Sequence, residues 1–197
     1  MRRRRFPGRP VRRKPLAGMP PNRRPIPPKL REAHRLFETG EYEKAAKLYA
    51  DLAVKAQERG FPQAPNLFLR CGVSWLKAGD LEQAQEMTMK GLGILAVRKK
   101  WMQLKKSGAL AVERMKAEGQ VALAGEIESW LEAQVPEAVR GSDAWKKQVS
   151  FNNRADSVKL PSNCSKCGGP VNPKELDWVD AQNPVCAFCG VILVTEM

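Results

Sequence analysis

Four of the five cysteines in this 197-residue chain lie in two matched pairs. Cys164 and Cys167 are separated by two residues, as are Cys186 and Cys189, and eighteen residues separate the inner two cysteines. Thiolate sulfur is a preferred ligand of Zn²⁺, and two such pairs supply the four ligands of a closed tetrahedral site. We therefore predict that these four cysteines bind one structural zinc ion.

The same four ligands leave other chemistry open. Sulfur ligands alone do not distinguish zinc from iron, so a rubredoxin-like iron site that transfers electrons could use the same residues. A dithiol redox site needs one C-x-x-C pair at a helix N-terminus, and two matched pairs argue against it. A closed Cys₄ site has no open position for a substrate, which favours the structural role.

The sequence around the pairs is suited to a small domain held by its metal. Each pair is followed by a glycine, Gly168 or Gly190, that can adopt the positive φ of a tight knuckle. The spacer has room for a short hairpin, and the β-branched VILV at 191–194 is typical of a strand. Residues 163–197 thus resemble a zinc ribbon, a fold too small to form without its metal. The side chains expected to cover the site are Val171, Trp178 and Phe188.

No other group of residues predicts catalysis. The fifth cysteine, Cys71, lies in a helical stretch, and the only histidine, His34, has no supporting motif beside it. The G-x-G at 91–93 lies inside a helical pattern and lacks the rest of a dinucleotide-binding motif. Acidic pairs such as Glu41 and Glu43 flank helix starts, where carboxylates interact favourably with the helix dipole. We therefore expect a protein that is not an enzyme.

The cysteine pairs follow a segment with a repeated helical pattern. Glycines at 40, 79 and 119 are 39 and 40 residues apart, and each begins a similar string: GEYEKA, GDLEQA and GQVALA. Each glycine also lies between two apolar stripes with helical spacing. Helix, glycine turn and helix, three times at a fixed period, predict a stacked α-hairpin solenoid within residues 29–147. We expect Pro136 to end the array, a short helix to Lys147 to cap it, and residues 148–162 to form a linker.

This pattern resembles the tetratricopeptide repeat family. The second unit carries the resemblance best, because Gly72, Trp75, Gly79, Leu81 and Ala84 fall at the family's spacing. The period is about five residues longer than the family's 34, which a longer second helix would explain. The resemblance implies that the first helix of each hairpin lines a concave face. The Asn/Lys/Arg set with which some members clasp a C-terminal carboxylate is not reproduced, which leaves a mixed apolar and basic groove for a protein partner. Its candidate contact residues are His34, Phe37, Asn66, Leu69, Val73 and Lys77.

The net charge of +13 is concentrated at one end of the chain. Residues 1–29 hold eleven Arg and Lys and no acid, so only +2 remains for everything downstream. Residues 1–28 also hold eight of the fifteen prolines, which predicts an extended, disordered arm. Such an arm is suited to the phosphates of RNA or DNA, or to an anionic membrane surface. The candidate polyanion-binding residues are Arg2, Arg3, Arg4, Arg5, Arg12 and Arg13.

These features favour a mainly α protein that acts as an adaptor. No segment approaches the roughly 18 apolar residues of a membrane span, and C-x-x-C pairs indicate a reducing compartment, so we expect a cytoplasmic protein. Its main work would be to bind a protein partner through the repeats. The alternative is a nucleic-acid-associated protein that uses the arm and the ribbon, and a weaker one is electron transfer at an iron-loaded Cys₄ site.

Overall fold

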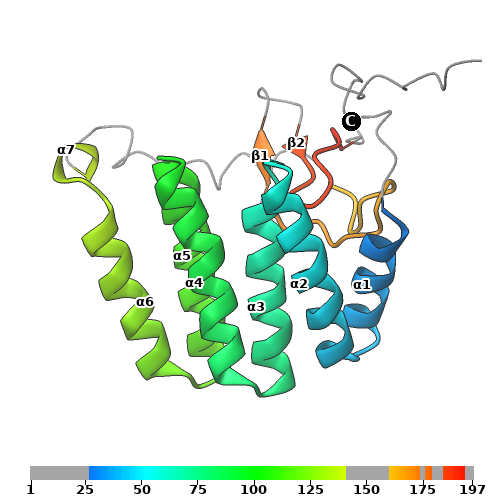
Figure 1. The fold of residues 1–197 in the computed structure, drawn as a ribbon, viewed down its shortest axis with the longest axis horizontal. Coiled ribbons are helices and arrows are strands. Elements are labelled where there is room, and N and C mark those ends of the chain that lie inside the picture. The colour runs from blue at the N-terminus through cyan, green and yellow to red at the C-terminus, as the bar shows by residue number, and fades with distance from the viewer. Residues whose placement is uncertain (1–26, 141–159, 174–175, 179–183, 194–197) are drawn as a thin grey trace, which may run out of the picture.

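The computed structural model of this chain describes residues 27–140, 160–173, 176–178 and 184–193. The first six helices form three hairpins that follow one another in chain order across the molecule (Figure 1). They confirm the predicted mainly helical fold, and we call them the helical array. The helices of the described part are α1 (Pro28–Glu38), α2 (Tyr42–Glu58), α3 (Ala64–Ala78), α4 (Leu81–Val97), α5 (Trp101–Ala117), α6 (Val121–Gln134) and the short α7 (Glu137–Arg140).

The three repeated glycines make the turns within the hairpins. Gly40, Gly79 and Gly119 have φ values of +81°, +87° and +77°, a left-handed conformation that residues with a side chain rarely adopt. This geometry lets the next residue cap the preceding helix with a backbone hydrogen bond to the carbonyl five positions back. The three N–H···O bonds are 2.8–3.1 Å long and join Glu41 to Leu36, Asp80 to Trp75, and Gln120 to Met115.

Helices α3 and α4 approach closely because glycines face the neighbouring helix. A Cβ atom added at Gly72 would lie 3.0 Å from the carbonyl oxygen of Ala84, and one added at Gly91 would lie 3.0 Å from that of Pro65. Both positions leave no room for a methyl group unless the backbone moves. The absence of a side chain at these two positions therefore permits the close approach of α3 and α4.

Two apolar clusters form the core of the described residues. One lies among α3 to α6 and includes Leu92, Leu104 and Ile127. The other lies among α1 to α4 and also contains residues from the C-terminal part of the chain, including Phe188 and Leu193. The C-terminal part therefore shares its apolar core with the first helices of the array.

The described residues between 160 and 193 form what we call the cysteine segment, which lies beside α1, α2 and α3 (Figure 1). It contains the two-residue strands β1 (Asp177–Trp178) and β2 (Pro184–Val185), which pair antiparallel. The strand predicted at 191–194 is reduced, within the described residues, to one bridge between Ile192 and Val185.

Several sequence predictions concern residues outside the described part. Residues 1–26 of the predicted basic arm, with all six candidate arginines, lie outside it. The last residue assigned to the arm, Pro28, is the first residue of α1, which thus begins one residue earlier than expected. Of the predicted cap helix, α7 covers Glu137–Arg140. Most of the predicted linker also lies outside. Among the helices that are described, none has both the length and the hydrophobicity needed to cross a membrane.

Candidate metal centre

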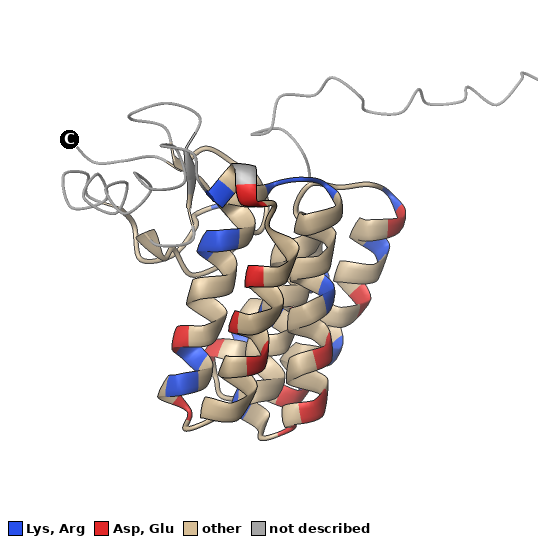
Figure 2. Ribbon diagram, turned by 90° about the vertical axis from the view of Figure 1, so that its left-hand side faces the viewer, with Lys and Arg blue, Asp and Glu red and all other residues tan. Residues whose placement is uncertain are grey.

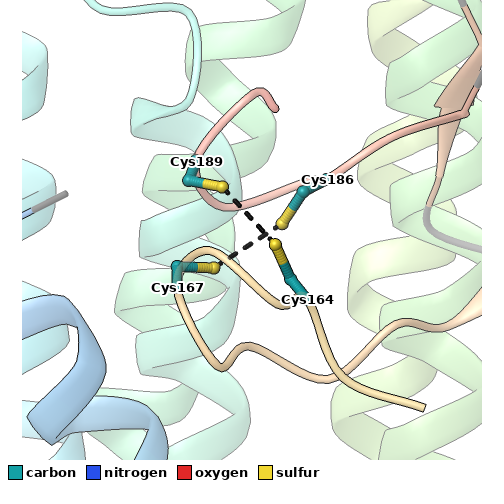
Figure 3. Close-up of side chains that lie close together, drawn as sticks. All are labelled: Cys164, Cys167, Cys186 and Cys189. Atoms are coloured by element: carbon teal, nitrogen blue, oxygen red, sulfur yellow. Dashed lines mark hydrogen bonds between the residues drawn. The ribbon is translucent and has the colours of Figure 1, made fainter. Parts of the chain in front are cut away.

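The four paired cysteines converge from two loops onto one point (Figure 3). All four Sγ atoms lie within 4.8 Å of one another. The Sγ atoms of Cys164 and Cys189 are 3.8 Å apart, as are those of Cys167 and Cys186. Sulfurs at the corners of a tetrahedron, about 2.3 Å from a central ion, are separated by about 3.8 Å. The quartet can therefore hold a metal ion, and its dimensions are consistent with zinc.

Each cysteine pair forms a tight loop of the same geometry, and we call residues 164–168 and 186–190 the two knuckles. Gly168 and Gly190 have φ values of +75° and +68°, as the sequence predicted. Each of these glycines donates its N–H to the carbonyl of the first cysteine, over 2.8 Å in one knuckle and 2.9 Å in the other. The first cysteine of each pair donates in turn to a carbonyl just beyond the knuckle, at Gly169 or Val191, over 2.8 Å.

Because the four sulfurs lie so close together, their thiols have different pKa values. Hydrogen bonding with Cys167 is the main cause that lowers the pKa of Cys164, and the same pairing raises the pKa of Cys167. Four thiolates at this separation repel one another, so all four ionise together only around a cation. A bound Zn²⁺ would supply that charge and cross-link the two knuckles, and the closed quartet leaves no ligand position for a substrate.

The cysteine segment lies against one side of the helical array (Figure 2). Residues of α1, α3 and α5 bond to it, and we call this side the docking face. Each of these helices contributes at least one polar contact to it. The hydrogen bonds run from Arg31 to the Lys166 carbonyl (3.0 Å), from Asn163 to the Glu38 carboxylate (3.0 Å), from Asn66 to the Ala187 carbonyl (2.7 Å) and from Lys106 to the Leu176 carbonyl (2.7 Å).

His34 lies at the centre of this contact. Its ring is 4.8 Å from that of Phe188, edge to face, and its side chain is only 1% exposed. Its Nδ1 is 2.6 Å from the hydroxyl of Tyr49. Burial, with a smaller contribution from Arg70, lowers the pKa of His34 to about 4. The imidazole is therefore neutral near pH 7 and serves as a packed core group of the contact.

Arg70 is a second polar side chain buried beneath the cysteine segment. It is 8% exposed, and its Cζ lies 4.0 Å from the ring centroid of Phe37 and 5.5 Å from that of Phe188. Cation–π contacts of this kind are favourable in a desolvated site. The guanidinium thus lies between an aromatic ring of the array and one of the second knuckle.

The fifth cysteine, Cys71, is not part of the quartet and differs from it chemically. It is fully buried, and its Sγ lies 3.3 Å from the carbonyl oxygen of Ala46. Burial raises its pKa to about 12, so the thiolate needed of a nucleophile is not formed near neutral pH. Cys71 is a core residue of the array.

The six predicted partner-binding residues fall into three groups. His34 and Phe37 lie in the contact just described. Asn66, Leu69 and Val73 line one pocket between α3 and α5. Lys77 is exposed away from both, where it pairs with Glu118 over 3.1 Å. Of the predicted cover of the metal site, Phe188 is 4% exposed, Val171 packs against the first core cluster, and Trp178 lies in β1.

Arg70 and the attachment of the cysteine segment to the array were not predicted from the sequence. The available signal was the position of Arg70 in the apolar helical string NLFLRCG, four residues after Asn66. That spacing puts both side chains on one helix face, which the chain's own second knuckle covers.

Comparisons with protein-family models, with curated proteins and with solved structures find no match to this chain.

Proposed function

We propose that this chain is a non-enzymatic adaptor that binds a protein partner through a tetratricopeptide-like helical array, to which a structural zinc ribbon is docked. The shared glycine turns of three hairpins support the first part, and the tetrahedral spacing of four thiols supports the second. We propose zinc as the metal and the cytoplasm as the location, since thiols there stay reduced.

The observation that carries this proposal is a pocket on the docking face that the cysteine segment leaves open, the α3–α5 pocket. Its empty space of about 720 Å³ includes the open solvent at its mouth, so it is a hollow in the surface. Half-buried Leu69, Val73 and Leu110 give it apolar walls. Ala187 and Phe188 of the second knuckle close one side. The pocket is thus composite and needs both parts of the chain.

The charge of the pocket indicates the kind of segment that it would accept. Lys106 and Arg114 are half-buried and line it, and none of the described residues that line it is acidic. Complementary charge steers association and fixes the register of a bound chain. A partner segment that carries an acidic residue beside apolar ones matches this surface.

The test is selection of a random-peptide phage library on the zinc-loaded full chain, followed by affinity measurement of the selected peptides. We expect enrichment of sequences with Asp or Glu next to apolar residues. Replacement of Arg114→Met should weaken their binding about tenfold, the loss of about 1.4 kcal/mol of binding free energy.

Lys116→Met is the matched control on the same helix, because Lys116 pairs with Glu128 over 2.7 Å and does not line the pocket. It should leave affinity within about twofold. If no peptide is selected, or if selected peptides bind the two variants equally, the pocket is not the partner site.

A further inference from the structure

Arg70 carries a charge that is buried in the folded chain. Within the described part of the chain no carboxylate forms a salt bridge with it, although its side chain is 92% removed from solvent. Its buried Nε also has no hydrogen-bond partner among the described residues. Its other contacts are the Tyr49 hydroxyl and the rings of Phe37 and Phe188, none of which carries a full negative charge. A buried cation without a counter-charge is strongly unfavourable. A negative charge of another kind is therefore needed nearby.

The cysteine quartet supplies such a charge when a metal is bound. Four thiolates around one Zn²⁺ carry a net charge of −2, and three of the four cysteines are at most 2% exposed. This centre also needs a counter-charge, because solvent reaches it poorly. The two unbalanced charges, one on the array and one in the cysteine segment, have opposite signs.

The contacts bring these two charges together. Arg70 lies over Phe188, which is itself in the knuckle between Cys186 and Cys189. His34 and Tyr49 are near both charges: His34 interacts electrostatically with both Arg70 and Cys164, and Tyr49 with both Arg70 and Cys167. Other cations of the described residues at this contact are less buried than Arg70: Lys166 and Lys106 are only partly buried, and Arg31 is exposed.

We propose that the guanidinium of Arg70 is the counter-charge of the metal–tetrathiolate centre, so that metal binding and the docking of the cysteine segment on the array are coupled through this residue. The inference rests on metal binding by the quartet. Arg70 also lines the α3–α5 pocket, so its test measures zinc binding in the absence of any peptide. Arg70 is a positioning residue that acts on the centre through space and touches no sulfur by hydrogen bond.

The first experiment measures zinc affinity of the full chain by competition with a chromophoric chelator. Arg70→Met removes the charge and keeps a long side chain, and it should weaken zinc binding about tenfold to a hundredfold, as loss of supporting residues around metal sites does. Arg70→Lys keeps the charge and should retain most of the affinity. Arg98 is a partly exposed arginine on the array whose side chain donates to the Phe61 carbonyl. Arg98→Met is the matched control and should bind zinc like the wild type.

A second measurement separates charge from packing, with folding of each variant checked by circular dichroism. In the iron-substituted chain the centre changes from −1 to −2 on one-electron reduction, so a nearby cation favours the reduced form. Arg70→Met should shift the reduction potential to more negative values, and Arg70→Lys should not. Equal zinc affinity in Arg70→Met and Arg98→Met would overturn the proposal, as would an Arg70→Lys chain as impaired as Arg70→Met. A wild-type chain that binds no zinc would instead overturn the metal site itself.

Discussion

At the scale of single residues, Gly169 shows how tightly the cysteine segment fits the array. It follows the first knuckle directly, and a Cβ added there would lie 2.7 Å from Cδ2 of Phe188 and 2.9 Å from Nε2 of His34. Both rings are buried and pack against each other, so neither has free space into which to move. The cysteine segment can therefore pack on the array in this way only if residue 169 has no side chain.

We predict that Gly169→Ala destabilises the folded chain by about 1–3 kcal/mol, the usual penalty of overpacking a well-filled core. Thermal unfolding of the zinc-loaded chain measures the effect. Gly125→Ala in α6 is the control, because nothing lies within 4 Å of its added Cβ; alanine is favoured there by about 0.5–1 kcal/mol over glycine in a helix. Equal melting temperatures for the two variants would show that the segment is not packed on the array as described.

At the scale of secondary-structure elements, most of the helices and turns could be predicted from the sequence. Helices and turns are encoded locally: an apolar stripe defines a buried face, and a glycine permits the left-handed turn that ends a hairpin's first helix. The six long helices could therefore be predicted, and so could the two knuckles with their positive-φ glycines. The strand expected at 191–194 was a poorer prediction, because β-branched residues favour a strand only where a partner strand is present.

The packing of α3 on α4 provides a test at this scale, since two glycines on one helix differ in their surroundings. We predict that Gly91→Ala destabilises the chain by about 1–3 kcal/mol, because the new methyl group meets backbone atoms of α3 at Pro65 and Leu69. Gly93→Ala, two residues away and with nothing within 4 Å, should be stabilising by about 0.5–1 kcal/mol. Denaturant titration of both variants measures the difference, and destabilisation of the same size in both would contradict the close approach of these two helices.

At the scale of the whole molecule, the joining of the two parts could not be predicted from sequence patterns. The hydrogen bonds between the array and the cysteine segment connect residues 70 to 135 positions apart, and periodicity reports nothing over such distances. The sequence identified the four cysteines that can hold a metal ion and the helix faces that carry Asn66 and His34. It did not indicate that the chain's own second knuckle, with Phe188, covers part of the face expected to receive a partner.

Zinc-dependent docking also predicts a pH effect centred on His34. Its pKa in the folded chain, about 4, is depressed below the ordinary value of 6.5. The unfolded chain therefore binds this proton first as the pH falls. The stability contributed by the neutral imidazole is complete above pH 6.5 and is lost as the pH falls from there towards about 4.

The docking of the cysteine segment on the array is tested most directly by an NMR titration of the His34 ring, the only imidazole in the chain. The titration runs from about pH 8 to about pH 5.5. In the zinc-loaded full chain we predict that the ring stays neutral over this range, because Phe188 and Gly169 cover it. After zinc is removed with a chelator, the covering segment should leave and the ring should titrate near its ordinary pKa of 6.5. Titration near that value in the zinc-loaded chain would contradict the central claim that the metal-binding segment is docked on the helical array.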